Sequence, residues 1–176
     1  MIRSFMGIEP TIDASAWVDE TALVVGDVVL GADVSVWPMT VIRGDVNHIR
    51  IGARTNVQDG TVIHVAHAGG RNPDGFPAII GEDVTIGHRA VVHACTVGDA
   101  CLIGIGAIIM DGAVLEDEVI LGAGALVPPG KRLESGYLYV GSPARRQRAL
   151  TDDEREFLRY SARNYMEITR QHRPGA

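Results

Sequence analysis

Aliphatic residues recur at every sixth position along most of the chain. From Ile12 onward the series has 18 positions, and each is Ile, Val or Leu. They are Ile12, Val18, Val24, Leu30, Val36, Ile42, Ile51, Val57, Ile63, Ile80, Ile86, Val92, Val97, Ile103, Ile109, Leu115, Leu121 and Val127. A period of six fits neither an amphipathic helix nor a simple alternating strand. It is typical of the hexapeptide β-helix, in which each repeat forms one short strand and a turn.

A second column of small or β-branched residues, four positions after the aliphatic one, supports this register. Its members are Ala16, Ala22, Val28, Val34, Thr40, Val46, Thr55, Thr61, Val84, Ala90, Ala107, Ala113, Val119 and Ala125. We expect them at tight corners. Three repeats close one triangular coil, so the 18 repeats predict six coils, each buried against its neighbours. At about 4.8 Å per strand the prism would be roughly 25–30 Å tall.

The repeat is interrupted by extra residues at 48–50, by a longer insertion at 69–79, and by one repeat of five residues after Val92. These interruptions fall between otherwise regular repeats. The pattern ends at the turn signal Pro128-Pro129-Gly130.

The C-terminal part of the chain carries a different pattern. Thr151 and Glu154 form a capping box, which predicts the start of a helix. One apolar stripe follows, at Phe157, Leu158, Tyr165 and Ile168, so we expect this helix to pack along a face of the prism. We therefore divide the chain into a β-helix domain, residues 1–133, and a linker with the C-terminal helix, residues 134–176.

Composition narrows the function classes. Aliphatic side chains must form the core, because 46% of the residues are hydrophobic but only 5% are aromatic. The net charge is −6, and no Lys/Arg cluster interleaves with aromatic residues, which argues against nucleic acid as a partner. The N-terminus lacks a signal-type apolar stretch, and no segment resembles a membrane span. Cys95 and Cys101 are too few for a disulfide framework, so we expect reduced thiols in a cytoplasmic protein.

The repeat count places the histidines on the prism. His64 and His93 each follow an inward aliphatic residue, and three repeats separate them, so both point outward from one face, one rung apart. Arg43 occupies the same column one rung earlier. His88 belongs to a different repeat and a different face, where Asp59 precedes it by one rung.

Two interpretations of these histidines stay open on geometry alone. They can be ordinary solvated surface residues. Alternatively, a threefold homotrimer brings His88 of one chain to His64 and His93 of the next. Three imidazoles with a fourth position open form a catalytic zinc site.

These residues resemble the γ-class carbonic anhydrases and their hexapeptide-repeat relatives, from about Ile8 through the C-terminal helix. The motifs are 42–45 (Ile-Arg-Gly-Asp), 55–60 (Thr-Asn-Val-Gln-Asp-Gly), 63–64 (Ile-His), and 86–88 (Ile-Gly-His) with His93. The resemblance implies a left-handed parallel β-helix, a homotrimer, and reversible hydration of carbon dioxide to bicarbonate.

The resemblance also implies roles for individual residues. His64, His88 and His93 would bind the metal, with two ligands from one subunit and one from the next. Arg43 and Asp45 would form an ion pair between subunits, although an ordinary structural salt bridge is an equal and compatible interpretation. Gln58 and Asp59 would orient the water that the metal activates. Imidazole ligands suit Zn²⁺, Fe²⁺ and Co²⁺ alike.

One departure from that family bears on activity. Its best-characterised enzymes carry glutamates near the metal that relay protons, whereas here Val46 follows Asp45 and the loop 66–78 has Asp74 but no Glu. His67 is the nearest substitute relay. From the helix, Tyr160, Asn164 or Tyr165 could reach the site, and the sequence does not choose among them.

Two other functions remain open. Many hexapeptide prisms are acyltransferases or thioesterases that act on CoA esters, and residues 141–144 (Gly-Ser-Pro-Ala) suit that class, but they occur in both classes. An acyltransferase needs one basic His beside a CoA groove rather than three in register. A metal-stabilised scaffold without turnover is the third possibility.

Overall fold

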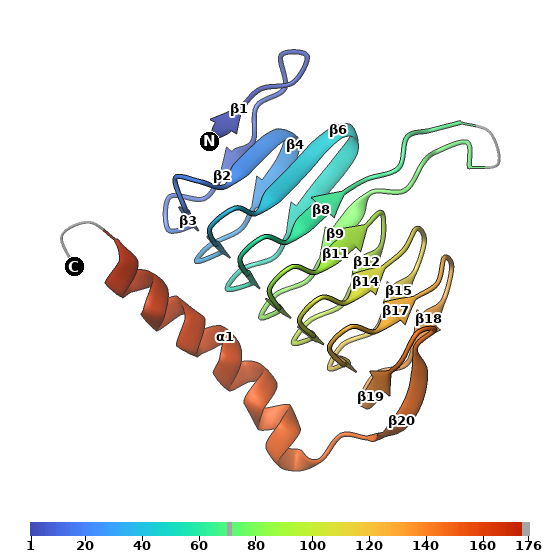
Figure 1. Ribbon diagram of the computed structural model, residues 1–176. Helices are drawn as coiled ribbons and strands as arrows, with labels where there is room; N and C mark the ends of the chain where they lie inside the picture. Colours follow the sequence, from blue (N-terminus) through green and yellow to red (C-terminus); the bar gives the residue numbers. More distant parts are fainter. Residues whose placement is uncertain (70–71, 174–176) are drawn as a thin grey trace.

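The chain folds into a parallel β-helix with one α-helix along its side (Figure 1). This computed structural model describes residues 1–69 and 72–173. The elements are β1 (Ile2–Arg3), β2 (Thr11–Ile12), β3 (Trp17–Val18), β4 (Leu23–Leu30), β5 (Ser35–Val36), β6 (Val41–Ile51), β7 (Asn56–Val57), β8 (Val62–His64), β9 (Ala78–Ile80), β10 (Thr85–Ile86), β11 (Val91–His93), β12 (Thr96–Val97), β13 (Leu102–Ile103), β14 (Ile108–Ile109), β15 (Val114–Leu115), β16 (Ile120–Leu121), β17 (Leu126–Val127), β18 (Arg132–Leu133), β19 (Tyr137–Val140), β20 (Arg145–Ala149) and α1 (Asp152–His172).

Strands stack in parallel because each third repeat returns to the same face. One 12-stranded sheet wraps two faces of the prism, and an 8-stranded sheet forms the third. We call the surface of β8, β11, β14 and β17 the histidine face. The 8-stranded sheet is the helix face, because α1 packs on its strands β5, β7 and β10.

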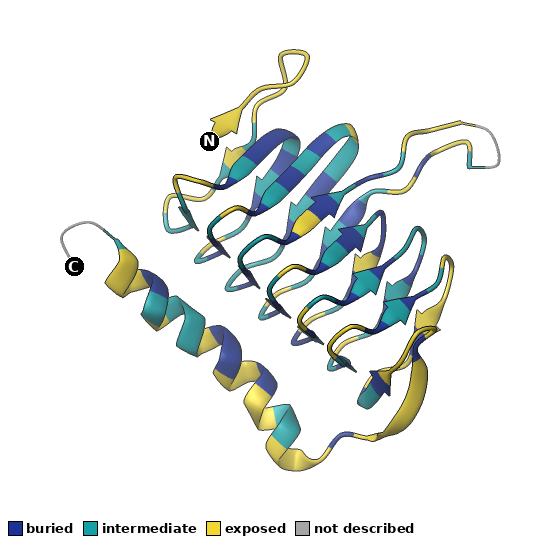
Figure 2. Ribbon diagram, viewed as in Figure 1, coloured by how far each residue is buried: buried dark blue, intermediate teal, exposed yellow. Residues whose placement is uncertain are grey.

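The predicted aliphatic column forms the core. All of its members are buried except Ile12 and Val18, which pack against the core at the N-terminal end. In Figure 2 buried positions follow the stacked strands, whereas β1, β20 and much of α1 are exposed. Each inward side chain contacts the coils above and below, so the core is continuous along the prism.

The prism is longer than the six predicted coils. β18 pairs with β15 and β19 pairs with β16, so the expected linker from residue 134 begins with a strand of the prism. The reason is visible in the spacing: buried Leu133 and Tyr139 continue the period of six beyond Val127, and Pro128-Pro129-Gly130 makes one more corner. β20 then pairs antiparallel with β19 and forms the last strand of the 8-stranded sheet.

Val46, expected at a tight corner, lies within strand β6 and is 47% exposed. Strand β6 runs through a corner where the ladder to β4 shifts register between Gly26 and Val28. Residues 45–48 of β6 lie opposite Asp27 alone, so the three extra residues form a bulge here and not at 48–50 as expected, because Ile49 and Arg50 are back in register with β4. The bulge carries Asp45 away from the prism wall and toward the histidine face.

Helix α1 starts at the predicted capping box, in which Thr151 and Glu154 bond each other's backbone. Leu158 is buried as expected, and Tyr165 and Ile168 are half-buried, but Phe157 is 49% exposed, so its predicted place in the stripe is wrong. Four residues of the helix are buried, and three of them are smaller than the predicted stripe residues. The four are Leu158, Ser161, Ala162 and Thr169.

Contacts at both ends of α1 fix its position. Glu118, in the turn before β16, forms ion pairs with Arg155 and Arg159 of the helix. At the other end Trp37 packs edge-on against Tyr165, with ring centroids 5.6 Å apart.

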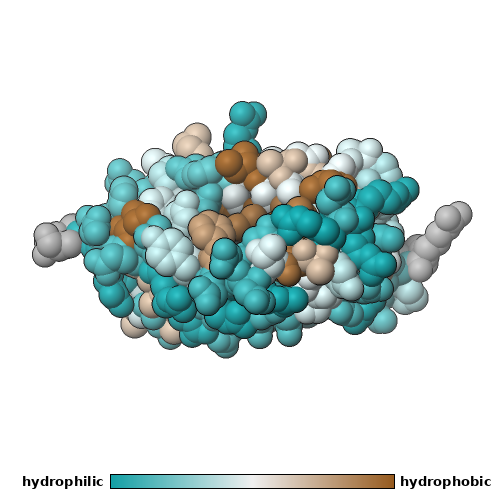
Figure 3. Space-filling model, turned by 90° about the horizontal axis from the view of Figure 1, so that it is seen from below, coloured by the Kyte–Doolittle hydropathy of each residue, from teal (hydrophilic) through white to brown (hydrophobic). Residues whose placement is uncertain are grey.

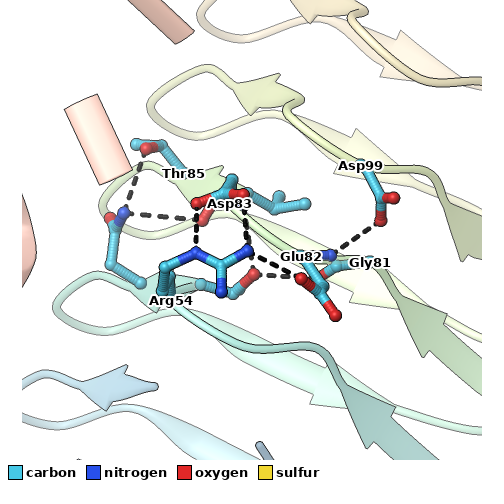
Figure 4. A network of polar contacts seen from close by, with 9 residues as sticks. Arg54, Gly81, Glu82, Asp83, Thr85 and Asp99 are labelled. Carbon is cyan, nitrogen blue, oxygen red and sulfur yellow. Dashed lines mark hydrogen bonds and ion pairs between the residues drawn. The ribbon is translucent and has the colours of Figure 1, made fainter. Parts of the chain in front are cut away.

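Polar networks join successive coils at the corners. Arg54 donates to Asp83 at 2.7 Å and to Glu82 at 2.6 Å (Figure 4). The hydrogen bonds from the guanidinium to these two carboxylates raise the pKa of Arg54. The backbone N–H of Glu82 in turn donates to Asp99, one coil further on. This corner is remote from the histidines and serves the stacking of coils.

Both cysteines are free and buried, and burial raises the pKa of the Cys95 and Cys101 thiols to about 12. Among the described residues, no helix combines the length and the apolar character needed to span a membrane.

Candidate metal centre

Two histidines meet on the histidine face. Parallel pairing of β8 with β11 sets His64 opposite His93, and pairing of β6 with β8 sets Arg43 opposite His64, as the repeat count predicted. His64 Nδ1 lies 3.2 Å from His93 Nε2. The two rings therefore turn nitrogens toward each other across one strand spacing.

A carboxylate supports each ring from behind. Asp45 Oδ1 lies 3.0 Å from His64 Nε2, and Asp111 Oδ1 lies 2.6 Å from His93 Nδ1. A carboxylate only accepts hydrogen bonds, so these nitrogens carry the protons. In the neutral rings the facing nitrogens then present lone pairs.

Asp45 and His64 also tune each other's charge. Burial lowers the pKa of His64, the hydrogen bond to Asp45 opposes this, and the charge of Arg43 adds to it, with a net fall. Burial alone would raise the pKa of Asp45, but hydrogen bonds from His64 and Arg43 outweigh it, and that pKa falls too. A neutral imidazole beside an ionised carboxylate is the state that a metal ligand requires.

The residues present fit a tetrahedral metal ion. Two nitrogens that share one zinc at about 2.0–2.1 Å lie about 3.3 Å apart. The separation of 3.2 Å between the His64 and His93 nitrogens agrees with that value. Carboxylates on the far ring nitrogens are the usual outer support of such ligands.

His88 stands apart from this pair. It lies in the turn after β10, at the corner between the helix face and the histidine face, rather than on a flat face as predicted. Its Nδ1 is 2.9 Å from Asp59 Oδ2, so the predicted stacking of these two residues is confirmed. Within residues 1–69 and 72–173, no three His, Cys, Asp or Glu side chains converge as a metal-binding group.

Gln58 begins a chain of polar side chains beneath α1. It is 4% exposed, and its Nε2 donates to Asn56 Oδ1 at 3.1 Å. Asn56 Nδ2 donates to Thr85 Oγ1 at 3.0 Å, and Thr85 contacts Ser161 of the helix at 2.9 Å. This series of hydrogen bonds fixes the orientation of the Gln58 amide, and Asp59 is the next residue along the chain.

The remaining predicted residues divide between two places. Arg43 forms an ion pair with Asp45 of the same chain, two residues further along β6. The resemblance implied a pair between subunits. His67 lines a cavity of about 500 Å³ with His64 and His93; residues 70–71 of its loop lie outside the described residues. Of the helix candidates, Tyr165 lies near Gln58, and burial raises its pKa, whereas Tyr160 is 55% exposed.

Asp111 is the site residue that sequence reasoning missed. It follows Ile109 by two positions, whereas His93 follows Val92 by one, so the two residues share no column of the repeat. Their contact depends on the turn after β14, in which Asp111 lies. An acidic residue one rung beyond a candidate ligand was the available signal.

Comparisons with known proteins place the chain among hexapeptide-repeat proteins. A family model described as bacterial transferase hexapeptide (six repeats) matches residues 94–129. Protein YrdA of Escherichia coli (strain K12) is 52% identical over 166 residues, which cover 94% of this chain and 90% of that protein.

The mitochondrial gamma carbonic anhydrase 2 of Arabidopsis thaliana is 42% identical over 175 residues. That match covers 97% of this chain but 62% of the plant protein, so the chain spans less than two thirds of its length. Among solved structures, a hexapeptide transferase family protein from Anaplasma phagocytophilum superimposes with a TM-score of 0.90 at 40% identity, over 98% of both chains.

Proposed function

Because the chain belongs to the γ-carbonic-anhydrase-like hexapeptide-repeat family, we propose that it is a metal-dependent enzyme that reversibly hydrates carbon dioxide to bicarbonate. One observation carries the proposal: His64 and His93 face each other at a separation that suits a shared metal, each with a carboxylate behind it. His88 of the partner subunit supplies the third imidazole. Zinc is the proposed ion, and ferrous iron or cobalt suits the same nitrogens.

The proposed assembly is a homotrimer with three such sites. The corner that carries His88 and the face that carries His64 and His93 are different surfaces of one chain, so their contact is head-to-tail and closes as a ring. Exposed apolar side chains flank both surfaces: Ile105, one rung beyond His88, is 57% exposed, and Val62 on β8 is 38% exposed.

The chain's own groups have distinct tasks in this proposal. A divalent cation at the site would supply the Lewis acid that brings the pKa of water to about 7. Asp45 and Asp111 hold the ring protons of His64 and His93 away from the cation. Gln58 and Asp59 orient the reacting water, and Asp59 also accepts a hydrogen bond from His88 Nδ1.

Mixed trimers test the shared site. His88→Ala and His93→Ala chains are each expected to lose zinc and hydration activity, because each lacks a ligand. Coexpressed in equal amounts, they restore a site wherever an intact face meets an intact corner, which is about a quarter of the sites for random assembly. Stopped-flow hydration and zinc content should both recover to that fraction. Failure to recover in confirmed mixed trimers would refute a site shared between subunits.

Acyl transfer or hydrolysis of CoA esters is the second candidate. The solved relative is described as a hexapeptide transferase family protein, and an apolar groove adjoins Gln58 in this chain. Acyl-CoA turnover with no hydration by the zinc-loaded trimer would favour this candidate. A zinc-loaded trimer without either activity would favour the metal-stabilised scaffold. We propose the cytoplasm as the compartment, because both thiols are free.

A further inference from the structure

A groove runs between α1 and the histidine-side edge of the helix face. Its volume is about 380 Å³. Its lining includes Gln58, Leu102, Ile105, Ile120, Phe157 and Tyr165. Seen from below, apolar side chains gather in the middle of a face whose margins are mainly hydrophilic (Figure 3). The groove crosses the strands β7, β10, β13 and β16, so it is about 14 Å long at about 4.8 Å per strand.

A glycine column shapes the groove floor. The position occupied by Gln58 in one coil is occupied by Gly87, Gly104 and Gly122 in the next three. A Cβ at Gly104 would stand 2.4 Å from the backbone nitrogen of Ala123, so close stacking of the coils requires glycine there. No side chain projects from these three positions, so the floor of the groove beyond Gln58 is a trench of backbone between the side chains of its walls.

Polarity is confined to one end of the groove. The Gln58 amide uses one N–H for Asn56, which leaves its second N–H and its carbonyl for a ligand. Thr85 and Ser161 satisfy each other. Toward β16 the lining is aliphatic, and Phe157 of the helix also lines the groove while 49% of it stays exposed.

We propose that this groove binds a linear acyl chain whose carbonyl group hydrogen-bonds to the Gln58 amide. The groove crosses four strands, its walls are mainly apolar, and its polar end, at Gln58 and Tyr165, lies beside Asp59 and the proposed catalytic centre. The volume is many times that of carbon dioxide, so hydration alone leaves it unexplained. The proposal rests on the proposed function in one respect: it places the carbonyl end of the ligand at the proposed catalytic centre.

Binding can be measured without turnover. Butanoyl, hexanoyl and octanoyl amides of ethanolamine serve as neutral, stable probes in calorimetric titrations of the full-length protein. Each methylene that enters the groove is expected to tighten binding by about fourfold. Ala123→Phe puts a ring into the trench and should abolish this dependence on chain length. Ala32→Phe is the matched control, because Ala32 holds the same turn position at a different corner and is also exposed.

Two results would overturn the proposal: affinities that do not depend on chain length, or an unchanged dependence in folded Ala123→Phe protein. If Ala123→Phe does not fold, Leu102→Trp narrows the same groove from the strand side and must give the same loss. Zinc content and hydration measured on the same preparations report on the proposed function separately, so either idea can fail without the other.

Discussion

The carboxylate behind His93 gives the sharpest test of the site. Asp111 Oδ1 lies 2.6 Å from His93 Nδ1, and this contact fixes the ring proton on the nitrogen that points away from His64. Replacement by Ala removes both the acceptor and the negative charge. The ring is then free to turn, and to carry its proton on Nε2, where the cation should bind.

The expected loss follows from the size of such effects in other metal sites. Removal of a hydrogen-bond partner of a ligating histidine typically weakens metal binding by about 10–100-fold. Asp111→Ala should fall near the upper limit. Asp111→Asn keeps a carbonyl that can accept from Nδ1, so we expect a loss of about tenfold. The predicted order of zinc affinity is wild type, then Asn, then Ala.

Competition with a chromophoric chelator measures zinc affinity directly, and sedimentation velocity shows whether each variant keeps its assembly. Asp33→Asn is the control, because it removes the same charge at a residue that has no part in the site, and Asn tolerates the positive φ of 55° there. Wild-type affinity in assembled Asp111→Ala protein would refute the role of this carboxylate. A weaker Asn variant than Ala variant would refute the ranking.

Three further predictions concern stability. Hydrogen bonds from Arg159 and Arg155 lower the pKa of Glu118 below 4.5. The ion pairs therefore stabilise α1 fully above pH 4.5, and this stabilisation is lost as the pH falls through the lowered pKa. Trp37 fluorescence should report release of the helix in acid, and Glu118→Gln should remove this transition. Thr151→Ala removes the N-cap of α1 and should cost about 1 kcal/mol of unfolding free energy in denaturant titrations. Ile103→Ala opens a cavity at a residue with no solvent exposure and should cost about 2–5 kcal/mol by the same assay, against a smaller loss for outward-facing Ile108→Ala.

Much of this molecule could be predicted from the sequence because a solenoid repeats one local rule. The period of six fixes which residues point inward, and counting by three fixes which residues stack. Counting alone sets His64 opposite His93 and Asp59 beside His88, and both pairs are confirmed. Counting did not locate the end of the prism. Pro128-Pro129-Gly130 is a sequence typical of the end of a repeat, but in the structure it forms another corner.

Contacts that depend on the conformation of a corner could not be predicted by counting repeats. The repeat gives the column of a residue, but not the direction in which a bulge or a turn carries its side chain. Asp111 reaches His93 through such a turn, and Asp45 reaches His64 through the bulge in β6. Phe157 shows the same limit on the helix, since periodicity alone does not say how closely a helix approaches a sheet.

The irregularities of the repeat nevertheless show where function should be sought. A perfect solenoid presents the same surface at every rung, so a unique site requires a break in the repeat. The bulge at 45–48 places Asp45 near His64, and the insertion at 69–79 supplies Phe76 to the wall of the His64 cavity. The shortened repeat, 92–96, contains His93 itself. All three interruptions border the same pair of histidines, and each costs regular stacking. Such costs are often retained where the local geometry serves a ligand, so the three interruptions support the proposed metal site at His64 and His93.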